Sequence, residues 1–301
     1  MKTNKFFNAA FGVAVIAGLM FSSCKKESNQ EEETASAEDQ AMAENVYSDI
    51  NAMAGQAADI SSGAMTNYRL GDDQYVCSLS CATISRDSVN KIITITFNGG
   101  TCLDGRTRSG VLTVNYSASE NGATHYRDPG FSCTVSSTNY VVDGNAVNII
   151  NKTITNTTAV GFNPATTNLT WHIDAHLSIT KASGGTIDWN CNRDKTLLNT
   201  SDANVYHGAS TAITWSLARV GHTGSANGTC ADGDNFSLTI TSMLIRDFGG
   251  CIINGRHPFI EGTMDMTKGT RPIRHIDFGN GTCDNLATVT INNHSKTITL
   301  R

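Results

Sequence analysis

Charged residues make up only 16% of this 301-residue sequence, and no stretch of it is densely basic. The formal net charge is −5, and removal of residues 1–23, which carry Lys2 and Lys5 and no acids, takes it to −7. An acidic chain without a basic stripe lacks the electrostatic surface that nucleic-acid binding requires. We therefore expect no nucleic-acid partner.

The sequence also lacks the short motifs of common catalytic sites. It has no GxSxG nucleophile elbow, no HExxH metalloprotease motif, no P-loop and no dinucleotide fingerprint. Only 4 prolines occur, which excludes a proline-rich linker protein. We therefore expect no catalytic residues, and our first hypothesis is a binding or scaffolding module.

The one long apolar run, residues 6–21, is too short to span a bilayer comfortably. Lys2 and Lys5 precede it and Ser22-Ser23-Cys24 follows it, which is the layout of a signal peptide over residues 1–23. Small residues directly before a cysteine resemble the processing site of bacterial lipoproteins. We expect Cys24 to be lipidated and to anchor the chain through several acyl chains, with an ordinary cleaved signal peptide as the alternative.

Two short segments separate this signal from the rest of the chain. Residues 24–37 are charged and poor in apolar side chains, which predicts a disordered acidic tether. Over residues 38–63, apolar side chains such as Val46, Ile50 and Met53 recur every three or four positions. This spacing predicts one amphipathic helix that packs against a sheet or its open edge.

From residue 68 onward the apolar residues alternate with a period of two, and turns rich in glycine and asparagine separate the alternating segments. The predicted strands include residues 92–97, 111–116, 147–155, 169–179, 212–217, 236–245 and 286–291. Neither a second helical pattern nor a break in composition occurs between residues 68 and 301. We predict an all-β fold. After one N-terminal helix, residues 68–301 should form a single domain in which an antiparallel meander closes as a sandwich or a barrel-like sheet.

A unit of strand, glycine-rich turn and cysteine recurs in this region, for example at 95–104 and 276–285. After lipidation of Cys24 an even number of cysteines remains, which predicts disulfides in an exported chain, with free buried cysteines as the alternative. The candidates are Cys77, Cys81, Cys102, Cys133, Cys191, Cys230, Cys251 and Cys283. We favour a Cys251–Cys283 bridge because both cysteines follow Asp-Phe-Gly turns at like positions.

Two patterns are candidate metal sites. His172, Asp174 and His176 share one face of a predicted strand, but residues four apart on a strand lie about 13 Å from each other, so only neighbours could share an ion. Asp232 and Asp234 place oxygen ligands in a turn, as calcium loops do, without EF-hand spacing. A solvated strand face and an ordinary Asp-Gly turn are the alternatives. We expect no cofactor, with calcium as the alternative.

Three further groups could belong to a binding or catalytic site. Arg106 and Arg108 could grip a carboxylate or sulfate, with scattered surface charge as the alternative. Asp174, Asp188 and Glu261 could supply the paired carboxylates of a glycosidase. The second hypothesis is therefore a surface enzyme that degrades glycans or peptides with carboxylates or histidines on its loops. Aromatic residues could form a glycan-binding surface, with core packing as the alternative; they are Trp171, Trp189, Trp215, Tyr116, Tyr140 and Tyr206.

The segments 221–228, 236–244 and 276–300, together with Cys251, resemble uncharacterised outer-membrane lipoproteins of Bacteroidota. Those proteins share a lipidation site, a short N-terminal helix and a β-rich body that ends in a block like residues 277–291. The resemblance implies a β-rich outer-membrane lipoprotein that faces the cell surface or the periplasm, and it implies no activity. The expected partners are the membrane, through the acyl chains, and a glycan or an envelope protein.

Overall fold

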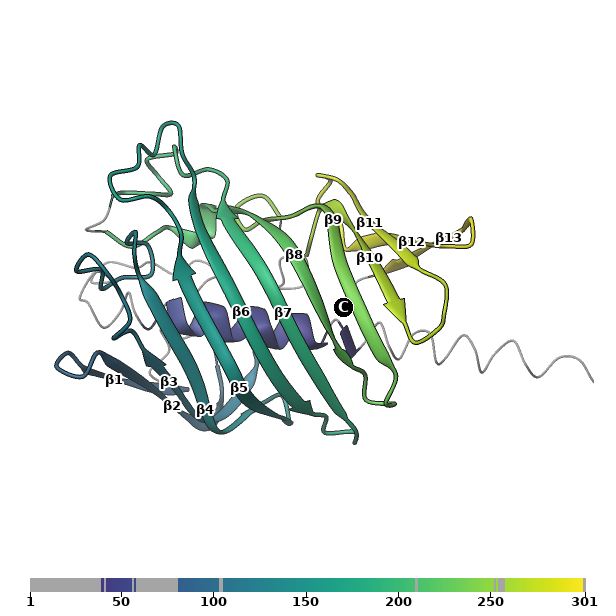
Figure 1. Ribbon diagram of the computed structural model, residues 1–301, viewed down its shortest axis with the longest axis horizontal. Coiled ribbons are helices and arrows are strands. Elements are labelled where there is room, and N and C mark those ends of the chain that lie inside the picture. Colours follow the sequence, from purple (N-terminus) through teal and green to yellow (C-terminus); the bar gives the residue numbers. More distant parts are fainter. Residues whose placement is uncertain are drawn as a thin grey trace, which may run out of the picture.

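A computed structural model describes residues 39–57 and 81–299, except for 41, 56, 103–104, 209–210, 252 and 254–257. Thirteen antiparallel strands form one sheet in which each strand pairs with its neighbours in chain order, which confirms the predicted all-β meander (Figure 1). The strands are β1 (Ala82–Asp87), β2 (Ile92–Thr101), β3 (Thr107–Asn115), β4 (Ser132–Val142), β5 (Asn145–Asn156), β6 (Leu169–Thr180), β7 (Thr186–Leu197), β8 (Arg219–Thr229), β9 (Asn235–Asp247), β10 (Glu261–Lys268), β11 (Arg274–Asn280), β12 (Leu286–Ile291) and β13 (His294–Thr299). The predicted signal peptide, the tether, Cys24 and Cys77 lie outside the described residues.

Alternation assigns each side chain to one of the two faces of the sheet. In β6, Trp171, Ile173 and every second residue from Leu169 to Ile179 are buried, and the residues between them are half-buried. Tight turns connect the strands: Asn292 and Asn293, between β12 and β13, take φ values of 48° and 65°, which a two-residue hairpin turn requires.

The predicted strand over residues 212–217 is wrong. This segment is a loop that ends in the short 3-10 helix η1 (Trp215–Leu217). Ala212 and Ile213 are buried, and the centre of the Trp215 ring lies 6.0 Å from that of the Trp171 ring. A short apolar segment of a buried loop can alternate in sequence as a strand does, and periodicity alone does not separate the two.

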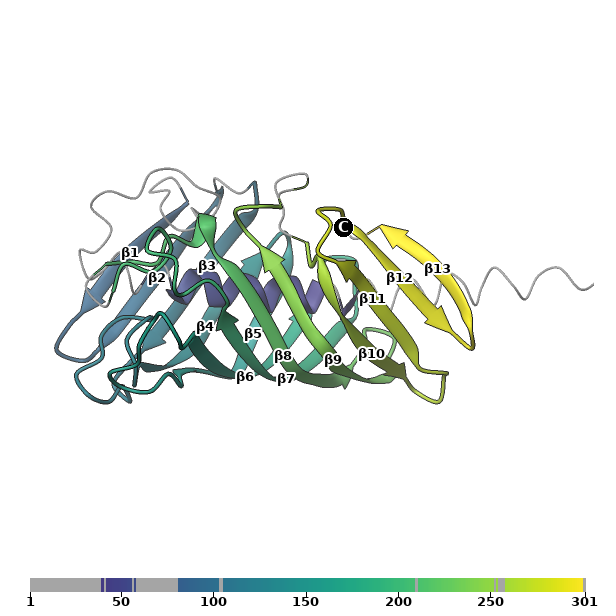
Figure 2. The same ribbon diagram turned by 90° about the horizontal axis from the view of Figure 1, so that it is seen from above.

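The sheet curves around a helix over residues 39–57, which crosses its inner face (Figures 1 and 2). Val46, Ile50 and Met53 are at most 1% exposed and belong to the same core as the inner strand residues. The prediction that this helix packs against the sheet is therefore confirmed. Unlike an ordinary amphipathic helix, it also has buried acids, Asp39 and Asp49, and among its described residues only Asn45 is exposed.

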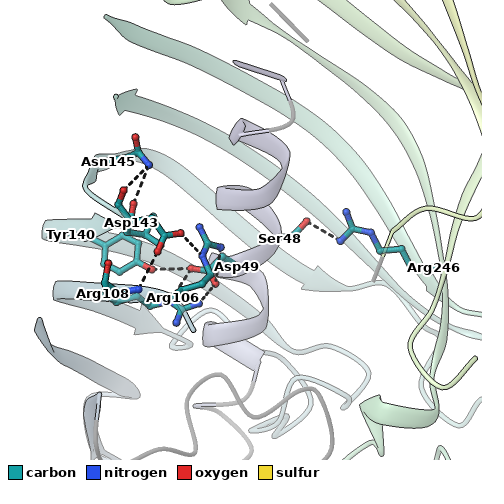
Figure 3. Close-up of polar contacts among 10 residues, drawn as sticks. Ser48, Asp49, Arg106, Arg108, Tyr140, Asp143, Asn145 and Arg246 are labelled. Carbon is teal, nitrogen blue, oxygen red and sulfur yellow. Dashed lines mark hydrogen bonds and ion pairs between the residues drawn. The ribbon is translucent and has the colours of Figure 1, made fainter. Parts of the chain in front are cut away.

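Asp49 joins the helix to β3 and β4 (Figure 3). Its carboxylate accepts hydrogen bonds from Arg108 Nη2 at 2.5 Å and Nε at 3.2 Å, and from the Tyr140 hydroxyl at 3.0 Å. Arg106 Nη1 lies 3.4 Å from the same carboxylate. The two arginines therefore bind a carboxylate, but this carboxylate is Asp49 of the same chain. Arg108 is buried and is not a surface charge.

Two more acids of the helix pair with basic residues of the sheet side. Asp39 accepts from Lys181 Nζ at 2.5 Å and from the Ala231 backbone N–H at 2.9 Å. Glu44 pairs with Arg193 on β7. The helix is thus fixed by charge-assisted contacts along its length as well as by apolar packing.

Two disulfides are present among the described cysteines. Cys81 bonds Cys102, and Cys251 bonds Cys283, with Cα–Cα distances of 5.0 and 5.2 Å. The favoured Cys251–Cys283 bridge is therefore confirmed.

Disulfide formation by the other described candidates is wrong, because Cys133, Cys191 and Cys230 are free, buried thiols. Cys133 on β4 and Cys191 on β7 are separated by two intervening strands, which exceeds the reach of a disulfide. Within the described ranges, no helix is both apolar enough and long enough to cross a bilayer.

Candidate binding surface on the outer face of β6 and β7

The outer face of β6 and β7, opposite the helix, is polar along its length. Direct cross-strand pairing places His172 opposite Asp194 and Asp174 opposite Asn192. Such opposed side chains lie about 5 Å apart at Cβ, close enough to form hydrogen bonds. We call these residues the outer-face network: His172, Asp174, His176, Asp188, Asn190, Asn192 and Asp194.

His172 lies at the centre of this network, between two carboxylates. Its Nδ1 is 2.7 Å from Asp194 Oδ1 and its Nε2 is 3.1 Å from Asp174 Oδ2. Asn192 Nδ2 donates to Asp174 Oδ1 at 2.7 Å. The residues are exposed enough to meet a ligand, with 34% of the His172 side chain and 57% of the Asp194 side chain accessible.

The surroundings of His172 favour its protonated form. The hydrogen bond to Asp194 is the largest cause that raises the pKa of His172, and the Asp174 carboxylate adds to it. A neutral imidazole has a single N–H, whereas the imidazolium can donate to both carboxylates at once. The proton on this ring therefore holds the two strands' carboxylates in a fixed arrangement.

His176 forms a second, separate group on the same face. Its Nε2 lies 2.8 Å from Asp188 Oδ2, and Asn190 Nδ2 donates to the other oxygen of Asp188 at 3.2 Å. The structure thus brings His172 and Asp174 together, as the alternation predicts, and directs His176 to a different carboxylate. Among the described residues, no group of three or more His, Cys, Asp or Glu side chains is placed to hold a metal ion.

Asp232 and Asp234, the calcium candidates, both lie beside a basic side chain. Lys268, whose side chain is fully buried, pairs with Asp232, and its Nζ lies 3.6 Å from Asp234. Arg271 adds a second positive charge 3.9 Å from Asp234. The Lys268 ammonium therefore supplies the positive charge that calcium would bring, and calcium would have to compete with it.

The other candidate groups are used in packing or in surface pairing. Trp171, Trp189 and Tyr140 are at most 1% exposed, so they build the core rather than a glycan-stacking surface. Tyr116 is also buried, Tyr206 is 9% exposed and Trp215 is half-buried against the core. Glu261, proposed as a glycosidase carboxylate, pairs with Arg219 at 3.0 Å.

Of the β7 half of the network, only Asp188 was predicted from the sequence as a site residue, and Asn190, Asn192 and Asp194 were not. Residues 188–194 read Asp-Trp-Asn-Cys-Asn-Arg-Asp, in which acids and amides occupy every second position. This alternation is typical of a strand with one solvent-exposed face, and it could have identified Asn192 and Asp194 as residues of that face. It could not have paired them with β6, because that depends on the register between the strands.

The chain matches no protein-family model, and comparison with curated proteins and with solved structures finds no significant similarity. The arrangement of the site is therefore the basis for a functional conclusion.

Proposed function

We propose that the protein is a lipid-anchored cell-envelope β-domain that acts as a binding or scaffolding module, and that the outer-face network contacts its ligand. The observation that carries the proposal is the position of the network: it lies on the side of the sheet away from the helix, with half-exposed carboxylates, amides and imidazoles. Cross-strand hydrogen bonds hold these groups in place before a ligand arrives, which lowers the entropy lost on binding.

The chemistry of the network favours a polar ligand. Carboxylates and amide oxygens accept hydrogen bonds, and amide and imidazolium N–H groups donate them, so a glycan hydroxyl or amine can meet either kind of partner. Trp171 and Trp189 are buried and Trp215 is half-buried against the core, which argues against binding that depends on ring stacking. A glycan is the ligand we favour, and an envelope protein is the alternative that the same experiment detects.

Binding is tested with the mature protein on an array of envelope and host glycans and in pull-downs from envelope extracts. His172→Gln and Asp194→Asn should each weaken binding at least tenfold, since each removes a charge-assisted contact worth about 1.5–3 kcal/mol. His275→Gln is a matched control because His275 Nδ1 lies 2.7 Å from Asp265 on the β10–β11 pair, which β8 and β9 separate from the network. The absence of any ligand, or equal losses in all three variants, would refute the proposed surface.

The membrane anchor has a separate test. Metabolic labelling with a radioactive or clickable fatty acid should label the expressed protein, and Cys24→Ser should abolish the label. Label that persists in the Cys24→Ser variant would remove the anchor from the proposal while leaving the binding surface open. Measured turnover of a glycan or peptide, lost in the His172→Gln variant, would instead favour the degrading enzyme.

A further inference from the structure

Lys152, on β5, places an ammonium group inside the protein. The residue is 1% exposed, on the inner face between the sheet and the helix. Its Nζ lies 4.2 Å from the centre of the Tyr47 ring and has no hydrogen-bond partner among the described residues. A buried charge without a hydrogen-bonded partner is strongly destabilising, so its retention requires an explanation.

Two more N–H donors in the same region lack acceptors. Trp189 Nε1 and Arg193 Nε are buried and make no hydrogen bond within the described part of the chain. Both residues are on β7, on either side of Cys191, and the Trp189 ring centre lies 5.0 Å from that of Tyr47. Arg193 is also close enough to the Tyr47 hydroxyl to affect its ionisation.

The strand register explains how Lys152 reaches this point. Lys152 pairs with Ala175 on β6, and Ala175 pairs with Cys191 on β7. The small alanine side chain leaves the long lysine side chain room to extend over β6 toward β7 and beneath Tyr47. Three donors from two strands therefore lie in one layer between the sheet and the helix.

The charges in this layer do not cancel. Lys152 and Arg193 supply two positive charges, and Glu44, paired with Arg193, supplies one negative charge. The nearby thiols do not compensate, because burial raises the pKa values of Cys133 and Cys191 to about 12 and keeps both neutral. Burial lowers the pKa of Lys152 to about 8, so most of it is still protonated at neutral pH. One positive charge remains.

We propose that Lys152, Trp189 and Arg193 form a buried binding site for a small monovalent anion of the halide class, chloride in particular. A halide accepts hydrogen bonds from ammonium, indole and guanidinium N–H groups alike, which are the three kinds of donor present. Its single negative charge equals the excess positive charge of Lys152, Arg193 and Glu44 taken together. The site lies on the opposite side of the sheet from the outer-face network and does not depend on the function proposed there.

The test measures unfolding of the full mature protein in urea while chloride replaces gluconate at constant ionic strength. For a dissociation constant on the order of 20 mM, raising chloride from about 10 to 500 mM should lower the unfolding equilibrium constant about 17-fold. Lys152→Met should remove this chloride dependence. Lys195→Met should retain it, because Lys195, on the same inner face of β7, lies over the Trp215 ring at 4.1 Å instead.

Several results would overturn the site. Equal responses to chloride and gluconate would do so, as would a Lys152→Met variant that keeps the full chloride response. Should Lys152→Met fail to fold, Trp189→Phe removes the indole N–H donor and keeps an aromatic ring at the position, and an unchanged chloride response in that variant would equally refute the site. In crystals grown with bromide, an anomalous peak is expected at hydrogen-bond distance from the three nitrogens; a water molecule there would refute the proposal.

Discussion

Replacing Asp49 with asparagine should be among the most damaging single changes in this protein. The substitution keeps the size of the side chain and removes the charge that faces Arg108, whose side chain is fully buried. Breaking one partner of a buried ion pair costs about 3–5 kcal/mol, because the other charge stays in the interior without compensation. The whole free energy of unfolding of a domain is about 5–15 kcal/mol, so the loss should be plain.

The measurement is urea-induced unfolding followed by tryptophan fluorescence, with the midpoint and slope fitted for each variant. Glu261→Gln is the matched control, because the Arg219–Glu261 pair has a similar 3.0 Å contact but both side chains are about 40% exposed. It should cost less than about 1 kcal/mol. A double variant, Asp49→Leu with Arg108→Met, should recover most of the stability. If Asp49→Asn stays within about 1 kcal/mol of the wild type, the ion pair does not fix the helix.

Three further outcomes are expected. Replacing Cys251 and Cys283 with alanine should lower the free energy of unfolding by about 3–4 kcal/mol, because the bridge closes a loop of 32 residues; denaturation with and without reductant measures it. The pKa of Lys152 is about 8 in the folded chain and about 10.4 when unfolded, so stability should rise by about 2 kcal/mol between pH 8 and pH 10, and Lys152→Met should abolish the rise. The raised pKa of His172 means that its ion pairs stabilise the fold below the ordinary histidine pKa and lose that effect as pH rises through the raised value; NMR titration should show this pKa falling in Asp194→Asn.

The strands were predictable to the extent that one face of each is apolar. Residues 169–179 of β6 alternate strictly, because this strand separates the core from solvent, and the sequence alone locates it. β8 was missed because Gly221, Gly224 and Gly228 interrupt its pattern; a Cβ at Gly224 or Gly228 would approach a backbone oxygen of β7 within about 2.2 Å. Close backbone approach, rather than hydrophobicity, determines those positions.

The two charge clusters were less predictable because their members are distant in the sequence. Asp49 lies 59 residues from Arg108, and no local pattern links them. Arg193 and Lys152 occupy inward positions of their strands, where sequence reasoning expects apolar residues. A charged residue at an inward position is the available signal, and it indicates that an opposite charge must come from elsewhere in the chain or from a ligand.

The distribution of charge between the two faces of the sheet explains why the folded sheet depends on the helix. The inner face carries basic residues such as Arg108 and Arg193, whereas the outer face of β6 and β7 carries Asp174 and Asp194. Without a counter-charge, the inner basic residues would be desolvated and would repel one another. Three acids of the helix supply most of that counter-charge, and the proposed anion completes it at Lys152. The helix therefore acts as an integral part of the core, and its removal should expose or unfold the inner face of the sheet.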